Sequence, residues 1–147
     1  MEKTILTNMC LIYSGDKVVV QDRIGDGWTG IAFPGGHVED KESFTDAVIR
    51  EIYEETGLTI KHPKLCGVKN WFCDDGSRYI VMLYKTEEFC GELKDSEEGR
   101  VFWTKLSELP KMNLASGMSE LISIYTDENI SELYYVKNGT EHRCIIK

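Results

Sequence analysis

The sequence predicts an α+β fold in which a mixed central sheet lies between helices, an α/β/α sandwich. Two observations support this: strand-like runs alternate with turn signals, and two longer stretches have helical composition. The chain has 147 residues, 41% of them hydrophobic, which suits one compact domain with a real core. Composition does not shift along the chain, and we find no repeat or linker. We therefore expect a single domain over residues 1–147.

Turn signals divide the predicted strands. Ser14–Lys17 separates the first two strands, Asp74-Asp75-Gly76 separates a central pair, and Asn138-Gly139 separates a terminal hairpin. A glycine-rich loop is expected over Gly25–Gly30, followed by the short apolar run Ile31–Phe33. The predicted strands are Thr4–Tyr13, Val18–Gln21, Leu65–Phe72, Arg78–Thr86, Val101–Thr104, Leu133–Val136 and Arg143–Ile146.

Two helices are expected. The first covers Ser43–Thr56, with Ser43 as a plausible N-cap and Gly57 at the position after the helix. The second covers Ala115–Tyr125, because apolar residues recur there at helical spacing. Those residues are Met118, Leu121, Ile122 and Tyr125.

Charge and composition exclude several classes of protein. The net charge is −8 and no Lys/Arg cluster occurs, which argues against binding long nucleic acid. No apolar run is long enough to span a bilayer, and the N-terminus does not resemble a signal peptide, so we expect a cytoplasmic protein that does not bind membranes. The five cysteines form no metal-binding pattern and are expected to be reduced. A phosphate-bearing substrate would need a bound cation to offset this negative charge.

Acidic residues replace apolar ones along one side of the first helix. The side that should face the core begins with Phe44, Ala47 and Val48, and in the next two turns it carries Glu51, Glu54 and Glu55. Like charges three and four residues apart destabilise an isolated helix by roughly 0.2–0.5 kcal/mol per pair. A solvated acidic face is the simpler interpretation. Because these acids continue an apolar stripe, they should instead border a cleft, where carboxylates and substrate phosphates together bind Mg²⁺.

The segment from Gly36 to Leu58 resembles the Nudix box, G-x5-E-x7-R-E-U-x-E-E-x-G-U, in which U is aliphatic. Every fixed position is filled, which makes this a highly specific motif. The matching residues are Gly36, Glu42, Arg50, Glu51, Ile52, Glu54, Glu55, Gly57 and Leu58. Phe33-Pro34-Gly35 and the surrounding strand pattern also look like the family.

The resemblance implies the Nudix fold, with the box as a loop–helix–loop and a C-terminal helix and hairpin. It implies that Glu51, Glu54 and Glu55 bind the metal, Mg²⁺ or Mn²⁺, and that the Gly35 carbonyl joins them. In the family the position of Glu51 is also the one most often proposed as the base. Two further box residues, Arg50 and Glu42, match an ion pair that holds the loop and orients these acids.

Outside the box the assignments have alternatives. Glu98 is our candidate for an additional metal-binding acid from a loop across the site, the alternative being a solvated acidic loop. Arg23 is a candidate phosphate contact or an exposed residue at a strand end. Asn113 matches the region where MutT-like members read a purine, although it also suits a helix cap. Trp28 and Phe33 are expected to pack in the core rather than stack on a base. The three histidines, His37, His62 and His142, are expected on the surface.

The expected reaction is attack of water on phosphorus in a nucleoside diphosphate linked to another group. The MutT-like resemblance favours a nucleoside triphosphate, (8-oxo-)dGTP-like, converted to the monophosphate and pyrophosphate. Hydrolysis of ADP-ribose or a nucleotide sugar is the alternative, and a non-catalytic nucleotide sensor is a third. The sensor is disfavoured because every box acid is present. The oligomeric state stays open, with a homodimer as one alternative.

Overall fold

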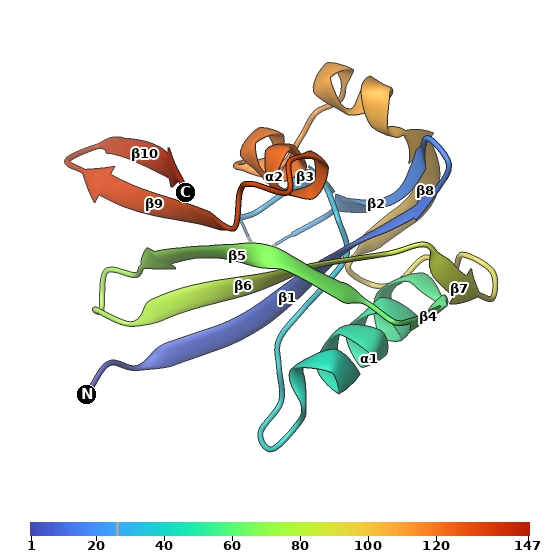
Figure 1. Cartoon of the computed structure of the whole chain (residues 1–147), viewed down its shortest axis with the longest axis horizontal. Coiled ribbons are helices and arrows are strands. Elements are labelled where there is room, and N and C mark those ends of the chain that lie inside the picture. The colour runs from blue at the N-terminus through green and yellow to red at the C-terminus, as the bar shows by residue number, and fades with distance from the viewer. Residues whose placement is uncertain (26) are drawn as a thin grey trace.

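The computed structural model describes residues 1–25 and 27–147 and shows a mixed sheet with a helix on each face (Figure 1). The helices are α1 (Phe44–Thr56), α2 (Met118–Thr126) and a short 3-10 helix, η1 (Leu106–Lys111). The strands are β1 (Thr4–Ser14), β2 (Lys17–Arg23), β3 (Gly30–Ala32), β4 (Thr59–Lys61), β5 (Lys64–Phe72), β6 (Arg78–Thr86), β7 (Glu88–Cys90), β8 (Gly99–Lys105), β9 (Glu132–Asn138) and β10 (Glu141–Ile146).

In the described part of the chain, eight strands form one mixed sheet, in the order β10-β9-β5-β6-β1-β2-β3, with β8 paired to β2. The pairs β1–β6 and β5–β9 are parallel, whereas the other pairs in this sheet are antiparallel. β2 pairs with β1 only near their shared turn and then runs beside β8 and β3. Short strands β4 and β7 form a separate two-stranded sheet. The expected α+β architecture with a mixed sheet is thus confirmed.

Successive side chains of a strand pack alternately into two hydrophobic cores, one on each face of the sheet. On β1, Met9 and Leu11 belong to the core under α2, whereas Cys10 and Ile12 belong to the core under α1. This alternation follows from the two-residue period of a strand. Both faces of the central strands are therefore covered, and the helices are fixed against opposite sides.

Helix α1 begins and ends where its sequence indicates. The Ser43 side chain accepts a hydrogen bond from the Asp46 N–H at 3.0 Å, and Gly57 follows the helix with a φ of 80°. Phe44 departs from the expected inward stripe because it is 47% exposed, whereas Ala47 and Val48 are fully buried. Phe44 is the first residue of the helix, before the inward side meets the sheet.

The expected strands are all present, with bounds that differ by a few residues. The expected second helix begins later than predicted, at Met118, because Gly117 before it has a φ of 85° and cannot be part of a helix. The expected loop Gly25–Gly30 includes Asp26, which lies outside the described residues. All five cysteines are unpaired, as expected. No helix in the described ranges is long and apolar enough to cross a membrane.

Candidate active site

The segment before α1 runs along β1 and sets the position of the box glycines. Backbone hydrogen bonds join the Cys10 N–H to the Pro34 carbonyl at 2.9 Å and the Asn8 N–H to the Gly36 carbonyl at 2.8 Å. The Asn8 side chain also accepts from the Gly36 N–H at 3.1 Å. Gly35, between these contacts, directs its N–H away from β1.

The Gly35 N–H donates to the Glu55 carboxylate at 3.0 Å. Glu55 is only 3% exposed, so this acid lies inside the protein as the continued stripe suggested. Among the described residues, no hydrogen bond uses the Gly35 carbonyl oxygen, which leaves it available to another partner. At Gly36 the neighbour is a side chain: a Cβ there would overlap the Glu51 carboxylate and displace it.

Arg50 is the hub of the acidic helix face. Its guanidinium donates to both Glu42 oxygens, at 2.7 and 2.9 Å, and to the His37 carbonyl at 2.9 Å. One of its nitrogens also contacts Glu51 at 3.0 Å and Glu54 at 3.1 Å. The expected Arg50–Glu42 pair is therefore present, and the same arginine offsets the repulsion expected between neighbouring acids of α1.

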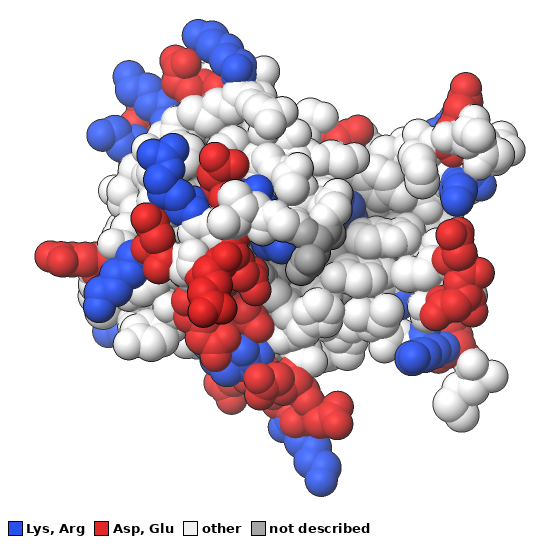
Figure 2. Space-filling model, turned by 180° about the vertical axis from the view of Figure 1, so that it is seen from behind, with Lys and Arg blue, Asp and Glu red and all other residues white. Residues whose placement is uncertain are grey.

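Glu98, from the loop before β8, lies at the same site, and its role in binding a metal stays a prediction. A cavity of about 270 Å³ opens between α1 and this loop. Figure 2 shows acidic side chains gathered in a dense patch on this face, over α1 and the loop that precedes it. The sequence had not singled out Ser96 and Glu97, whose place within an acidic loop gave no separate signal. The cavity is lined by Glu51, Glu54, Glu55, Ser96, Glu97 and Glu98.

Burial and mutual repulsion disfavour ionisation of the inner acids. Burial raises the pKa of Glu55 well above its usual range, and a hydrogen bond shared with Glu98 raises it further. Burial also raises the pKa of Glu51, although Arg50 opposes this shift. In contrast, hydrogen bonds from Arg50 lower the pKa of Glu42 to about 2. Glu42 is therefore ionised at neutral pH, whereas a nearby cation favours the ionised form of Glu51 and Glu55.

The donor set matches the chemistry of a hard divalent cation. Four carboxylates, of Glu51, Glu54, Glu55 and Glu98, and one free backbone carbonyl, of Gly35, are oxygen ligands of the kind that Mg²⁺ takes. Within the described ranges, no three such side chains already converge on one point. Two of the carboxylates that line the cavity, those of Glu51 and Glu54, also contact Arg50.

Arg23 lies beside this cavity rather than projecting into solvent. Its side chain is 24% exposed, and one guanidinium nitrogen lies 3.7 Å from the Glu98 carboxylate. The guanidinium also stacks over Trp28, 5.1 Å from the ring centre. Its Nε is buried without a partner among the described residues, so the arginine has donor capacity to spare. As expected, Trp28 packs at the edge of the core and Phe33 is fully buried.

Asn113 lies in the loop before α2, with its backbone carbonyl accepting from the Ile31 N–H at 2.9 Å. Its side chain is exposed and does not cap the helix, because the N-cap is Gly117. The capping alternative is therefore wrong, and the purine-reading role stays a prediction. The three histidines are exposed, as expected, although His62 contacts Glu88 at 2.8 Å.

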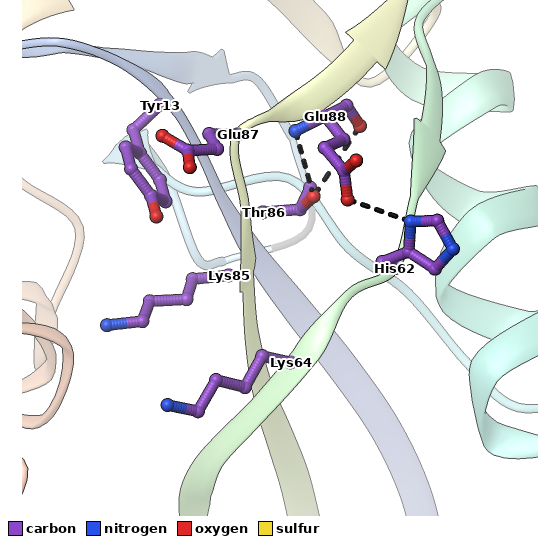
Figure 3. Close-up of a pocket in the computed structure, with 7 residues that line it drawn as sticks. All are labelled: Tyr13, His62, Lys64, Lys85, Thr86, Glu87 and Glu88. Carbon is purple, nitrogen blue, oxygen red and sulfur yellow. Dashed lines mark hydrogen bonds and ion pairs between the residues drawn. The ribbon is translucent and has the colours of Figure 1, made fainter.

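A second cavity, of about 250 Å³, lies where β1, β6 and the ends of β4 and β7 meet. Figure 3 shows Lys64 and Lys85 projecting in the same direction, away from the His62–Glu88 pair. Glu87 and Glu88 line the same cavity, so its charges balance and give no selectivity for an anion.

Comparisons with known proteins agree with this fold. Nudix hydrolase YvcI of Bacillus subtilis (strain 168) is 31% identical over 118 residues, 77% of this chain and 73% of that protein. An ADP-ribose pyrophosphatase of Methanocaldococcus jannaschii is 35% identical over 107 residues, 69% of this chain and 62% of that protein. The crystal structure of a mutator MutT protein from Bacillus halodurans matches with a TM-score of 0.77 and 28% identity, covering 95% of this chain and 97% of that one. The NUDIX domain family matches residues 4–123, and the chain therefore belongs to the Nudix hydrolases and resembles their MutT-like members.

Proposed function

We propose that this chain hydrolyses a diphosphate bond of a nucleoside triphosphate, (8-oxo-)dGTP-like, to the monophosphate and pyrophosphate, with Mg²⁺ or Mn²⁺. The observation that carries the proposal is the ring of carboxylates around one cavity in a chain of net charge −8. Such a cavity repels phosphates unless a cation lies between them. Nudix hydrolases generally use divalent metal ions, and this donor set suits one.

The chain's own residues have separable roles in this reaction. Glu51, Glu54, Glu55, Glu98 and the Gly35 carbonyl would hold the divalent cation. When bound, the cation polarises the phosphoryl oxygens and lowers the pKa of the attacking water. The oxygen of that water forms a bond to phosphorus, and the bond from phosphorus to the bridging oxygen of the leaving pyrophosphate breaks.

Glu51 is the proposed base that takes the proton of the attacking water. Burial raises its pKa, which makes its carboxylate a better proton acceptor than a solvated one. The Arg50 guanidinium, itself fixed by Glu42, holds the Glu51 carboxylate at 3.0 Å and so orients it. Arg50 and Glu42 are therefore positioning residues.

Two residues outside the box are proposed to bind the nucleotide. Arg23 lies next to the acidic cavity, with a guanidinium nitrogen 3.7 Å from the Glu98 carboxylate, and its remaining N–H donors suit a phosphate oxygen. Asn113 presents both a donor and an acceptor from an exposed loop beside β3, which suits the edge of a purine.

ADP-ribose is the second candidate substrate, because one relative, 35% identical over 107 residues, is an ADP-ribose pyrophosphatase. Both substrates contain a diphosphate that the same acids would bind. The test is a screen of nucleoside triphosphates, ADP-ribose and nucleotide sugars with Mg²⁺, followed by product analysis. Release of pyrophosphate and a monophosphate from a purine triphosphate supports the proposal. Cleavage of ADP-ribose alone would show that the proposed triphosphate substrate is wrong. If the wild type cleaves none of these compounds, so that it behaves like the Glu54→Gln control, the proposal that the chain is an enzyme of this kind is wrong.

A further inference from the structure

A lysine on β5 is buried without a counter-ion. Lys69 is 8% exposed, and among the described residues it makes no hydrogen bond or ion pair. Its ammonium nitrogen instead lies 5.4 Å from the ring centre of Trp71 and 4.9 Å from that of Tyr135. Burial lowers the pKa of Lys69, and the more distant Glu120 carboxylate opposes this shift. An ammonium on a mostly buried side chain is poorly solvated, so without an acceptor it has unused capacity to bind a ligand oxygen.

A second polar group without a partner points to the same place. The Tyr135 hydroxyl is buried and unpartnered among the described residues. A Cβ at residue 117 would lie 2.8 Å from the Lys69 nitrogen and 3.2 Å from the Tyr135 hydroxyl oxygen. Gly117 is the N-cap of α2 and offers no side chain to accept a hydrogen bond. Lysine, tyrosine and the start of a helix thus place hydrogen-bond donors around one point.

A row of aromatic rings leads to this point across the sheet. Tyr79, Trp71 and Tyr135 stand opposite one another on β6, β5 and β9. Trp71 and Tyr79 stack with ring centres 4.5 Å apart and planes at 13°. Neighbouring strands lie about 4.8 Å apart, so the row spans roughly 10 Å from Tyr79 to Tyr135. Half-buried stacked rings of this kind suit the flat face of a nucleobase.

Direct contacts connect the row with the acidic cavity. Glu98 of the cavity lies 3.7 Å from Arg23, whose guanidinium stacks over Trp28. The Trp28 indole donates to the Ser116 carbonyl at 3.2 Å, next to Gly117. On the other side, His37 of the box loop packs edge-on against Tyr79, with ring centres 6.4 Å apart. These contacts through Arg23 and Trp28 therefore lead from the carboxylates toward the place where Lys69 and Tyr135 lie.

We propose that Lys69 and Tyr135 form a subsite that selects a base with carbonyl oxygens on its edge over a base with an amino group there. The inference rests on the proposed nucleotide hydrolysis and narrows its substrate to keto bases, such as guanine or hypoxanthine, rather than adenine. Both donors can pair with a carbonyl oxygen, whereas an amino group cannot accept from the Lys69 ammonium and leaves it unpaired.

The test compares dITP with dATP, whose bases differ at position six, where hypoxanthine has an oxygen and adenine an amino group. With Mg²⁺, kcat/KM of the wild type should be roughly tenfold or more higher for dITP than for dATP. This is the effect expected of one hydrogen bond from a charged donor. Lys69→Met should bring that ratio close to one, and Tyr135→Phe should lower it less. Lys64→Met, at an exposed lysine on the same strand, is the matched control and should keep the wild-type ratio. Removing an unpartnered buried charge should not lower the Tm of Lys69→Met.

Binding of dIMP and dAMP, measured by calorimetry, separates this inference from the proposed function. If the chain hydrolyses triphosphates but neither binding nor kcat/KM favours the keto base, the inference is overturned and the proposed function stands. If no triphosphate is hydrolysed but dIMP binds more tightly and Lys69→Met abolishes the difference, the subsite is supported and the proposed reaction is wrong. An equal loss for both bases in Lys69→Met would assign the lysine a structural role and overturn the inference.

Discussion

Replacing Glu55 with glutamine should stabilise the metal-free protein at neutral pH. The carboxyl group is 3% exposed, has no cation partner among the described residues, and lies near Glu98 and Glu51. Glutamine keeps an oxygen for the Gly35 N–H, which donates to Glu55 at 3.0 Å, and removes only the charge. The side-chain volume is nearly unchanged, so no cavity is created.

The size of the effect follows from the raised pKa of Glu55. Above the ordinary glutamate value of 4.5, the folded chain retains a proton that the unfolded chain has released. The contribution of Glu55 to the free energy of unfolding is fully present below pH 4.5. It is lost as the pH rises toward the pKa that Glu55 has in the folded chain. The loss is at most about 1.4 kcal/mol per pH unit, or roughly 3 kcal/mol between pH 5.5 and 7.5. In a chain of this size that corresponds to about 5–10 °C in Tm.

The assay is thermal unfolding in EDTA at several pH values, with Glu128→Gln, an exposed acid after α2, as the control. Wild type and control should lose Tm as the pH rises, and Glu55→Gln should lose less and exceed the wild type at pH 7.5. Added Mg²⁺ should raise the Tm of the wild type more than that of Glu55→Gln, because the ion binds only the folded state. Equal Tm values and equal pH slopes for wild type and Glu55→Gln would refute this reasoning.

Three further variants test other parts of the site. Arg50→Ala should lower Tm and activity together, since it leaves Glu42 and Glu51 without their cation, as measured by thermal unfolding and turnover. Gly36→Ala should fold but lose most turnover, because the new Cβ, 2.3 Å from the Glu51 carboxylate, displaces only the end of a flexible side chain. Asn113→Ala should lower kcat/KM for purine triphosphates by about 1–3 kcal/mol and spare pyrimidine ones.

Each of these three variants has a result that would contradict its rationale. A fully stable and active Arg50→Ala protein, with Arg143→Ala as the exposed control, would remove Arg50 from its positioning role. Full activity of Gly36→Ala would show that the Glu51 carboxylate need not stay where it lies. An unchanged kcat/KM in Asn113→Ala would place recognition of the base elsewhere in the cleft.

The acidic helix was readable from the sequence because its caps and its spacing are local properties. Ser43 and Gly57 fix the ends of α1, and the regular 3.6-residue period places Glu55 on the buried side. What the period could not reveal was the degree of burial, which falls from Glu55 to Glu54 because the sheet covers only part of the helix. The role of Arg50 in joining three acids also depends on the fold, since Glu42 approaches it from the preceding loop.

The sequence did not predict the shortest elements, which are strands β4 and β7 and the 3-10 helix, for physical reasons. The three-residue strands β4 and β7 are too short to show a period of two, and they form by pairing with each other across the chain. The 3-10 helix contains Pro110, which reads as a helix breaker.

Lys69 had no local signal, because a lysine in a strand is usually exposed. Its burial depends on β9, which pairs with β5 from farther along the chain, Lys69 lying opposite Leu133. Tyr135, on that strand, reaches the same subsite only through this pairing. Strand periodicity indicates that Lys69 and Trp71 share a face, but not which face the rest of the protein covers.

Metal-dependent turnover tests the central claim most directly. Wild-type protein should release no product from a purine nucleoside triphosphate in EDTA and should recover turnover when Mg²⁺ or Mn²⁺ is added in excess. Glu54→Gln and Glu55→Gln should need more metal for the same rate, because each removes one carboxylate from the cavity. Undiminished turnover after thorough chelation, or an unchanged metal requirement in both variants, would contradict an acidic cavity that works by holding a cation.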